Sequence, residues 1–466
     1  MNATRRLAGL AAVLALCLVL GGASSAYAQA AAAAGSQDQA AKQPPYTMAE
    51  YNSYKACADD KVPASQIKCF DDFVSKYPNS ALLQYVYPAY YQAYGAQKNY
   101  AKVIENADKL IALGDKLDAA NRPQTLLQAY NVREGAWTTL PVADQTAGAA
   151  AARDAAIKAL KVLDDIKKPD NVSDADFAKS KQPYIIFFNN TGAQASVLLK
   201  DFAGAMSFYK AILVLNPDEP VTHYNMGKAD LAMAPPQSMD GFWHIAKAIT
   251  SKSATEPQKK QLTPYLKKLV LAYQGGTVCD ALTDSEFNEL LQLAGTSADR
   301  PESYKLFSTA DLDAARKDMT IASVIADLKA GGDKAKLTWF ASCGLEFPDV
   351  PGKLFEVTAP ATEADPVVLK LAFVSNQAEF DAATAPDMEV KVMGQPEAGK
   401  LNKDDTPAPR FTGTLETYDP APAFMLHWDK AKVNAEDLPK GKEKPATKKP
   451  PVRRPAPKKP SGRASN

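Results

Sequence analysis

The chain has few of the residues that catalytic and metal sites require. Its 466 residues include only three histidines, His223, His244 and His427. It contains no H-E-x-x-H, no G-x-S-x-G, no phosphate-binding loop and no G-x-G-x-x-G fingerprint. His223 and His244 could form a metal or acid–base pair, but two histidines without a ligand motif more often pack inside a protein. We therefore predict no enzyme, no cofactor and no metal.

Long apolar runs are also scarce, and the one that stands out is at the N-terminus. Arg5 and Arg6 precede an apolar run over residues 7–20, and Ala26-Tyr27-Ala28 follows as a cleavage site. This order is typical of a secretory signal peptide, here residues 1–28. The alternative is an uncleaved anchor, although a membrane helix needs roughly 18 or more apolar residues. We expect cleavage after Ala28 and an exported protein, periplasmic or associated with the envelope of a bacterial-type cell.

The formal net charge of +1 hides an uneven distribution. Residues 439–466 carry ten Lys/Arg and one Glu, a net charge of +9. Removing this +9 and the +2 of the two N-terminal arginines leaves residues 29–438 at about −10. Basic residues alternate with prolines in the tail, which predicts a disordered, locally polyproline-like segment. It could bind anionic lipid or envelope polymer, or cover the acidic body, and nucleic acid ranks last for an exported protein.

Four cysteines remain after cleavage: Cys57, Cys69, Cys279 and Cys343. An even number in an oxidising compartment predicts two disulfides, with three possible pairings. Cys57 and Cys69 flank a predicted helix–helix turn at residues 61–63, so we favour Cys57–Cys69 with Cys279–Cys343. The alternative is four buried thiols. A metal site is not expected without C-x-x-C spacing or a nearby histidine.

Helical periodicity dominates residues 46–331, after a flexible linker over residues 29–45. Apolar residues recur at three- and four-residue spacing, and Gly, Pro or Asn interrupts them regularly. The predicted helix pairs are 47–59 with 65–76, 80–96 with 99–113, 123–139 with 147–166, 182–199 with 202–215, 220–233 with 239–251, and 259–274 with 284–295. Helices near 301–307 and 310–330 would close the stack.

Residues 202–250 resemble the tetratricopeptide repeat, a helix hairpin of about 34 residues that stacks on its neighbours. Counting back from Pro217, Ala193 and Ala205 fall at the family's small positions and Tyr209 at its aromatic position. The next repeat matches at Met226-Gly227, Trp243 and Ala246. The resemblance covers roughly residues 47–275 and is strongest at 202–250. It implies a helical solenoid with a concave groove.

The chain also departs from this family. Asn189, Gly192 and Ile212 stand where Trp, Leu and a small residue are usual, and Tyr91 replaces a small residue. The alternative architecture is a non-repetitive helical bundle.

The resemblance implies a peptide-binding groove lined by the first helix of each pair. Its positions fall on Asn190, Gln194, Val197, Leu198, Val221, Tyr224, Lys228 and Leu231. Tyr224 and Lys228 are four residues apart, so they share a helix face and could hold an extended peptide. The alternative is that several of these residues pack between repeats. The tyrosines Tyr85, Tyr87, Tyr90, Tyr91 and Tyr94 are likewise either a binding stripe or core.

From residue 336 the pattern changes to short β-branched and aromatic runs, at 337–341, 354–358, 366–374, 388–393, 411–415 and 424–428. They predict a small all-β domain over residues 336–434, a barrel or a sandwich. An oligonucleotide/oligosaccharide-binding barrel is one possibility.

The sequence thus predicts an α+β multidomain protein: a tetratricopeptide-like helical solenoid, a small β domain and a disordered basic tail. The expected function is a non-enzymatic scaffold that binds peptide or protein partners. The alternative is a carbohydrate- or cell-wall-binding envelope protein that uses the β domain and the tail.

Overall fold

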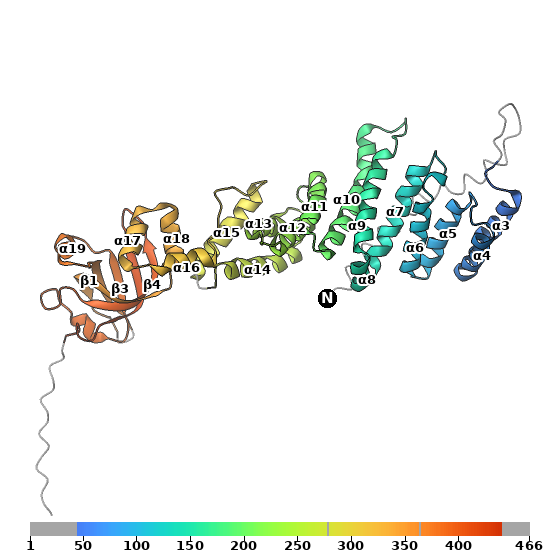
Figure 1. Ribbon diagram of the computed structural model, residues 1–466. Helices are drawn as coiled ribbons and strands as arrows, with labels where there is room; N and C mark the ends of the chain where they lie inside the picture. The colour runs from blue at the N-terminus through green and yellow to red at the C-terminus, as the bar shows by residue number, and fades with distance from the viewer. Residues whose placement is uncertain (1–43, 277–278, 363–364, 440–466) are drawn as a thin grey trace, which may run out of the picture. The chain divides into compact units, whose positions relative to one another are not determined.

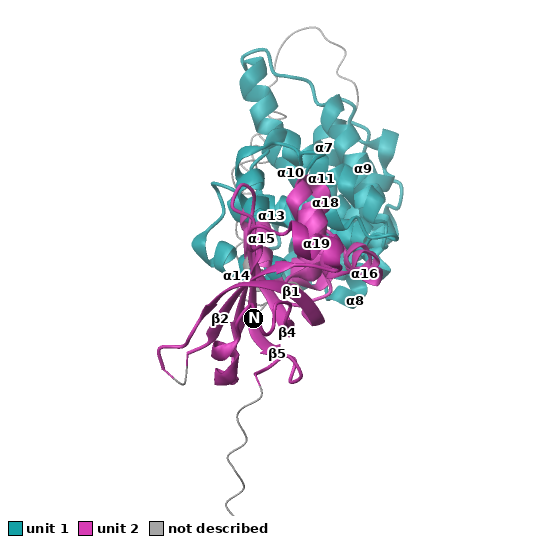
Figure 2. Ribbon diagram, turned by 90° about the vertical axis from the view of Figure 1, so that its left-hand side faces the viewer, with its two compact units in different colours: residues 1–267, 289–304 teal, residues 268–288, 305–466 magenta. Residues whose placement is uncertain are grey.

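The computed structural model describes residues 44–276, 279–362 and 365–439 (Figure 1). The predicted signal peptide and nearly all of the predicted linker and basic tail lie outside these residues. The chain forms two compact units (Figure 2). The helical unit comprises residues 1–267 with 289–304, and the barrel unit comprises residues 268–288 with 305–466.

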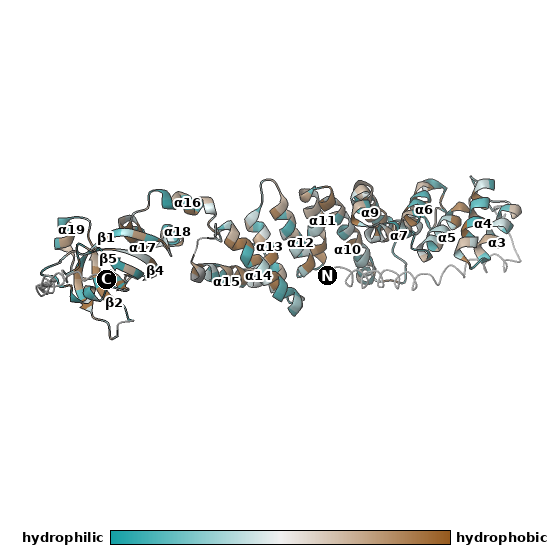
Figure 3. Ribbon diagram, turned by 90° about the horizontal axis from the view of Figure 1, so that it is seen from below, coloured by the Kyte–Doolittle hydropathy of each residue, from teal (hydrophilic) through white to brown (hydrophobic). Residues whose placement is uncertain are grey.

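Paired helices build the helical unit. In chain order they are α3 (Met48–Asp59), α4 (Pro63–Lys76), α5 (Leu83–Ala96), α6 (Tyr100–Ala112), α7 (Arg122–Thr139), α8 (Val142–Ala147), α9 (Ala149–Asp165), α10 (Asp174–Leu198), α11 (Phe202–Leu215), α12 (Pro220–Ala232) and α13 (Ser238–Thr250). Helices α14 (Glu256–Tyr273) and α15 (Asp280–Thr296) contribute residues to both units. Both brown and teal residues lie along individual helices in Figure 3, as expected for helices with one buried face.

Side-chain caps fix where several of these helices begin. Thr47, Asn99, Ser173 and Asp201 each accept a hydrogen bond from a backbone N–H in the first helical turn. Ser173 explains why α10 begins well before the predicted start at residue 182. Pro183 lies inside α10, so the proline did not mark its boundary.

Small residues lie where paired helices touch. Ala193 and Ala205 are fully buried and cluster with Tyr209, Ile212 and Met226. These residues lie on three helices, α10, α11 and α12, so one hairpin buries its apolar face against the next. This arrangement is the helix stacking expected of a repeat architecture.

Three helices precede the barrel in the second unit: α16 (Thr309–Lys317), α17 (Ile321–Ala330) and α18 (Gly332–Ser342). The predicted helix at 301–307 is wrong, because these residues form a turn followed by irregular chain. The predicted strand at 337–341 is also wrong, because it lies in α18. Thr338, Trp339 and Phe340 are consecutive and buried, and a short apolar run does not distinguish a buried helix from a strand.

The β domain is a closed five-stranded barrel, which settles the choice between barrel and sandwich. Its strands are β1 (Glu346–Thr358), β2 (Val367–Phe373), β3 (Met388–Val392), β4 (Arg410–Asp419) and β5 (Met425–Val433), in the order β1-β2-β3-β5-β4. The pairs are antiparallel except β3 with β5, which is parallel. A short helix, α19 (Gln377–Ala382), joins β2 to β3, and a 3-10 helix, η3 (Pro396–Lys400), follows β3.

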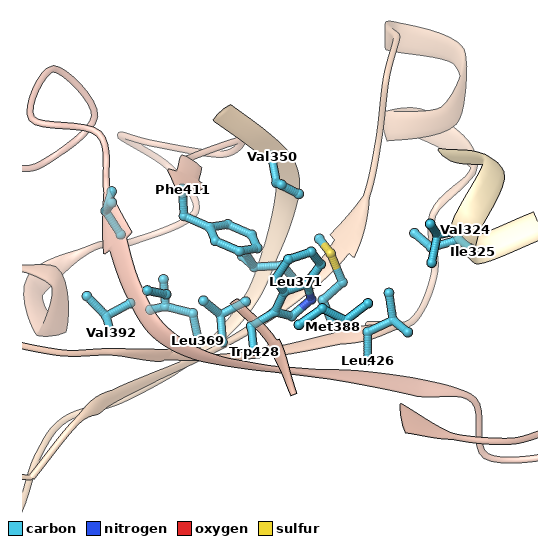
Figure 4. Close-up of a cluster of buried hydrophobic side chains, with 14 of the residues drawn as sticks. Val324, Ile325, Val350, Leu369, Leu371, Met388, Val392, Phe411, Leu426 and Trp428 are labelled. Carbon is cyan, nitrogen blue, oxygen red and sulfur yellow. The ribbon is translucent and has the colours of Figure 1, made fainter. Parts of the chain in front are cut away.

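Alternating side chains fill the barrel. Leu371, Met388, Phe411 and Trp428 are at most 1% exposed and point toward one another (Figure 4). Val324 from α17 belongs to the same cluster, so that helix helps to close the barrel core. Among the described residues, no helix combines the length and the apolar character needed to cross a membrane.

Candidate functional site

The best candidate site is an exposed face on helix α12. Pro220 occupies the first position of the helix and Glu219 caps it by accepting the N–H of Val221. Helix α13 packs against the opposite face, where Gly227 and Gly241 allow a close backbone approach. Val221, at 49% exposure, and Lys228 are therefore left on the open side of α12.

Two aromatic rings and one cation meet on this face. The Nζ atom of Lys228 lies 5.5 Å from the ring centre of Tyr224. Tyr265 of α14 meets Tyr224 edge to face, with ring centres 6.3 Å apart, and remains 37% exposed. Partial burial, and then the nearby Tyr265, raise the pKa of Tyr224, so its hydroxyl stays neutral over the physiological range. No described carboxylate lies within ion-pair distance of Lys228. Together these three residues form what we call the α12 face: Tyr224, Lys228 and Tyr265.

The other predicted groove residues divide between surface and core. Asn190 is exposed on α10. Gln194 instead donates a hydrogen bond of 2.9 Å to the side chain of Gln145 on α8, so it is part of a helix contact. Val197 and Leu198 are partly buried and pack against apolar clusters. Leu231 is also partly buried, and its side chain lies close to Gly241. The packing alternative therefore describes Gln194, Val197, Leu198 and Leu231 better than an open groove does, whereas Asn190 lies on the surface.

Tyr265 was missing from the predicted site. It lies 41 residues after Tyr224, whereas a strict repeat of about 34 residues would have pointed elsewhere. Tyr265 is an exposed aromatic residue in the first helix of the following pair, and this feature could have identified it.

The tyrosines of α5 belong mainly to the core. Tyr90 and Tyr91 are buried, and Tyr90 donates a hydrogen bond of 2.7 Å to Asp71. Tyr87 and Tyr94 are partly buried against the same clusters, and only Tyr85 is half exposed. No continuous aromatic binding stripe results on this helix.

The three histidines contact other side chains of the protein. His223 and His244 contact each other between α12 and α13, with their Nδ1 atoms 3.3 Å apart. His427 on β5 lies between two carboxylates, 3.4 Å from Glu389 and 2.9 Å from Asp419. Within the described ranges no three His, Cys, Asp or Glu side chains are grouped to hold a metal ion.

Four cysteines form two disulfides in the structure. Cys57 pairs with Cys69 between α3 and α4, and Cys279 pairs with Cys343 in the barrel unit. These are the two pairs favoured from the sequence. A shallow hollow of about 130 Å³ lies over the second disulfide, bordered by Thr414, Glu416, Asp429 and Lys430, among others. It is too small and open to enclose an organic ligand.

Comparison of the chain with protein-family models gives no match, and comparison with curated proteins gives none either.

Proposed function

We propose that the protein is a non-enzymatic interaction scaffold of the periplasm or cell envelope, with tetratricopeptide-like repeats that bind peptide or protein partners. The observation that supports it is the α12 face. There, Lys228 extends over the ring of Tyr224, and Tyr265 from the next helix pair adjoins it. Stacked hairpins commonly present such first-helix side chains on one continuous surface.

The chemistry of the α12 face suits a peptide. Aromatic rings offer a large contact area at low entropic cost, and a lysine that has no ion pair within the described part of the chain can meet a polar or anionic group. In the exported protein, the basic tail would add a second, charge-based contact to anionic lipid or polymer of the envelope.

A binding experiment on the full exported chain tests this function. Partners captured from envelope extract would be purified and titrated directly against wild type and against the double variant Tyr224→Ala/Lys228→Ala. We expect the double variant to bind at least tenfold more weakly, as for loss of a binding hot spot. Lys252→Ala, an exposed lysine in the turn after α13, is the matched control. Equal affinity of the double variant and wild type would contradict the proposal.

The barrel favours a second function, binding of carbohydrate or cell wall. Five strands close into this barrel, with a parallel β3–β5 pair, and five is the strand number of the oligonucleotide/oligosaccharide-binding barrels. Sedimentation with purified cell wall, using the full chain and a chain that lacks residues 440–466, tests this alternative. Binding that requires the tail but tolerates Tyr224→Ala/Lys228→Ala would favour it over the peptide scaffold.

A further inference from the structure

A chain of four polar groups runs through the interface of α12 and α13. Nε2 of His223 lies 2.9 Å from the carbonyl oxygen of Pro217, and Nδ1 of His223 lies 3.3 Å from Nδ1 of His244. On the far side of His244, Nε2 lies 4.0 Å from Oδ2 of Asp230. The side chain of Asp230 is 5% exposed, and its Oδ2 atom has no hydrogen-bond partner among the described residues.

The geometry fixes where the hydrogens sit. A carbonyl only accepts, so Nε2 of His223 must donate to Pro217. The Nδ1 atom of a neutral His223 is then an acceptor, and Nδ1 of His244 must donate to it. That leaves Nε2 of His244 as an acceptor facing Asp230. If Asp230 is ionised, two acceptors face each other across 4.0 Å without a hydrogen between them.

One added proton gives this network a donor that it lacks. A second added proton sets two donors against each other. A proton in the gap, on Asp230 or on Nε2 of His244, turns two facing acceptors into a donor and an acceptor. A proton on Nδ1 of His223 has the opposite effect, because two N–H groups would then face each other over 3.3 Å.

The remaining charged groups around the network are held by other contacts or lie outside it. They are Lys210 on α11, Asp218 and Glu219 before α12, and Asp240 and Lys247 on α13. Asp240 is paired with Arg300 at 3.0 Å, and Lys247 donates to the carbonyl of Ser297. Asp218 caps the turn after α13 by accepting the N–H of Lys252. None of these contacts supplies a hydrogen for the gap at Asp230.

We propose that His223, His244 and Asp230 form a proton-controlled latch on helix α12. One proton in the gap between Asp230 and His244 holds α12 on α13, and a second proton, on His223, releases it. Helix α12 carries Tyr224 and Lys228, so the latch also controls partner binding, a consequence that rests on the proposed function. Burial raises the pKa of Asp230 to about 7, whereas burial and then His223 lower the pKa of His244 to about 4, so the proton in the gap rests on Asp230. Burial also lowers the pKa of His223.

Hydrogen exchange of α12 and α13, corrected for intrinsic rates, tests the latch without any partner. Asp230→Asn places an N–H donor in the gap without taking up a proton, so it lacks the stabilisation that wild type gains as the pH falls from 7 to 5, and its protection relative to wild type should fall about tenfold over this range. His223→Gln keeps a donor toward Pro217 and removes the second site. Because this variant takes up only the proton that holds α12, its protection should rise about tenfold relative to wild type over the same range. His427→Asn, in the barrel, should behave as wild type.

The same pH dependence in wild type, Asp230→Asn and His223→Gln would overturn the latch. If either variant does not fold at pH 7, nitrogen NMR of the wild-type histidines decides. The latch requires the Nε2–H tautomer of His223 and the Nδ1–H tautomer of His244 at pH 7.5, and protonation of His223 only together with loss of α12 protection. Two histidines that titrate near pH 6.5 while α12 remains protected would overturn it. Neither readout involves a ligand, so failure of the peptide-binding proposal would leave this result interpretable.

Discussion

Gly227 and Gly241 bring the backbones of α12 and α13 into contact. A methyl group on Gly227 would lie 2.6 Å from the carbonyl oxygen of Gly241 and 2.7 Å from the side chain of Ile245. The backbone oxygen cannot move aside without separating the helices. The α12 face therefore depends on a contact that lies on the opposite side of the same helix.

Gly227→Ala should destabilise the α12–α13 hairpin by about 3 kcal/mol, because the added methyl overpacks a backbone contact. Hydrogen exchange of the two helices measures the local free energy of opening. Gly295→Ala is the matched control, since a methyl there would lie 3.7 Å from Thr250. That variant should be neutral or gain up to about 1 kcal/mol from helix propensity. Equal stability of the two variants would show that the close approach is not required.

Gly192 is a second position where a missing side chain matters. A methyl on Gly192 would lie 2.6 Å from the ring of Phe208 on α11. Gly192→Ala should cost about 1–3 kcal/mol in the free energy of unfolding, and Phe208→Leu in the same chain should restore part of it. Urea unfolding of both single variants and the double variant gives the coupling. If the free-energy changes of the two single variants add up to that of the double variant, the contact between Gly192 and Phe208 is contradicted.

This contact explains one difference between the chain and the repeat family that its sequence resembles. Gly192 occupies a position where a larger residue is usual, and Phe208 fills the resulting space. Ala193 and Ala205 were predicted at helix contacts, and both are fully buried there. Small residues at fixed spacing identify where helices touch, but the partner that fills a gap can come from any position on the facing helix.

Local sequence patterns predict structure poorly in two cases. In one, the turns between helices differ in length, and in the other, a short apolar segment is buried on both faces. Tyr265 is not predicted because the turns between helices differ in length. A fixed repeat length counted from Tyr224 therefore ends at another residue. Residues 337–341 were assigned to a strand because a short buried run reads the same in a helix and in a sheet. The five true strands were located approximately, and their closure into a barrel depends on pairing between distant segments, which local patterns do not specify.

Glu134 should make the helical unit less stable as pH rises. Its side chain is 0% exposed, its Oε1 atom accepts from Arg133 at 2.6 Å, and Oε2 has no hydrogen-bond partner among the described residues. Burial raises its pKa to about 7, against the lowering effect of Arg133. The folded state therefore holds a proton that the unfolded chain releases near pH 4.5, so this stability is present below that pH and is lost as the pH rises through 7.

Urea unfolding of wild type and Glu134→Gln at pH 5 and pH 8 measures this effect. Relative to the variant, wild type should lose about 3 kcal/mol between the two pH values, an upper bound because Arg133 is coupled to the carboxyl. Glu105→Gln is the control, because Glu105 is more than one-third exposed and its lysine partners lower its pKa below the tested range. A pH dependence unchanged by Glu134→Gln would mean that the carboxylate is ionised in the folded protein.

The two disulfides should stabilise different units by different amounts. Cys57 and Cys69 are 12 residues apart, and Cys279 and Cys343 are 64 apart. Cross-linking a longer loop removes more entropy from the unfolded chain, so Cys57→Ala/Cys69→Ala should cost about 3 kcal/mol and Cys279→Ala/Cys343→Ala about 4 kcal/mol. The first loss should appear in hydrogen exchange of α3 and α4, and the second in the barrel strands, because each bridge lies within one unit. A larger loss from the shorter loop would mean that packing around Cys57, which is 1% exposed, matters more than chain entropy. Reduction of wild type by dithiothreitol should reproduce both losses, since it removes the bridges and leaves the side-chain volumes nearly unchanged.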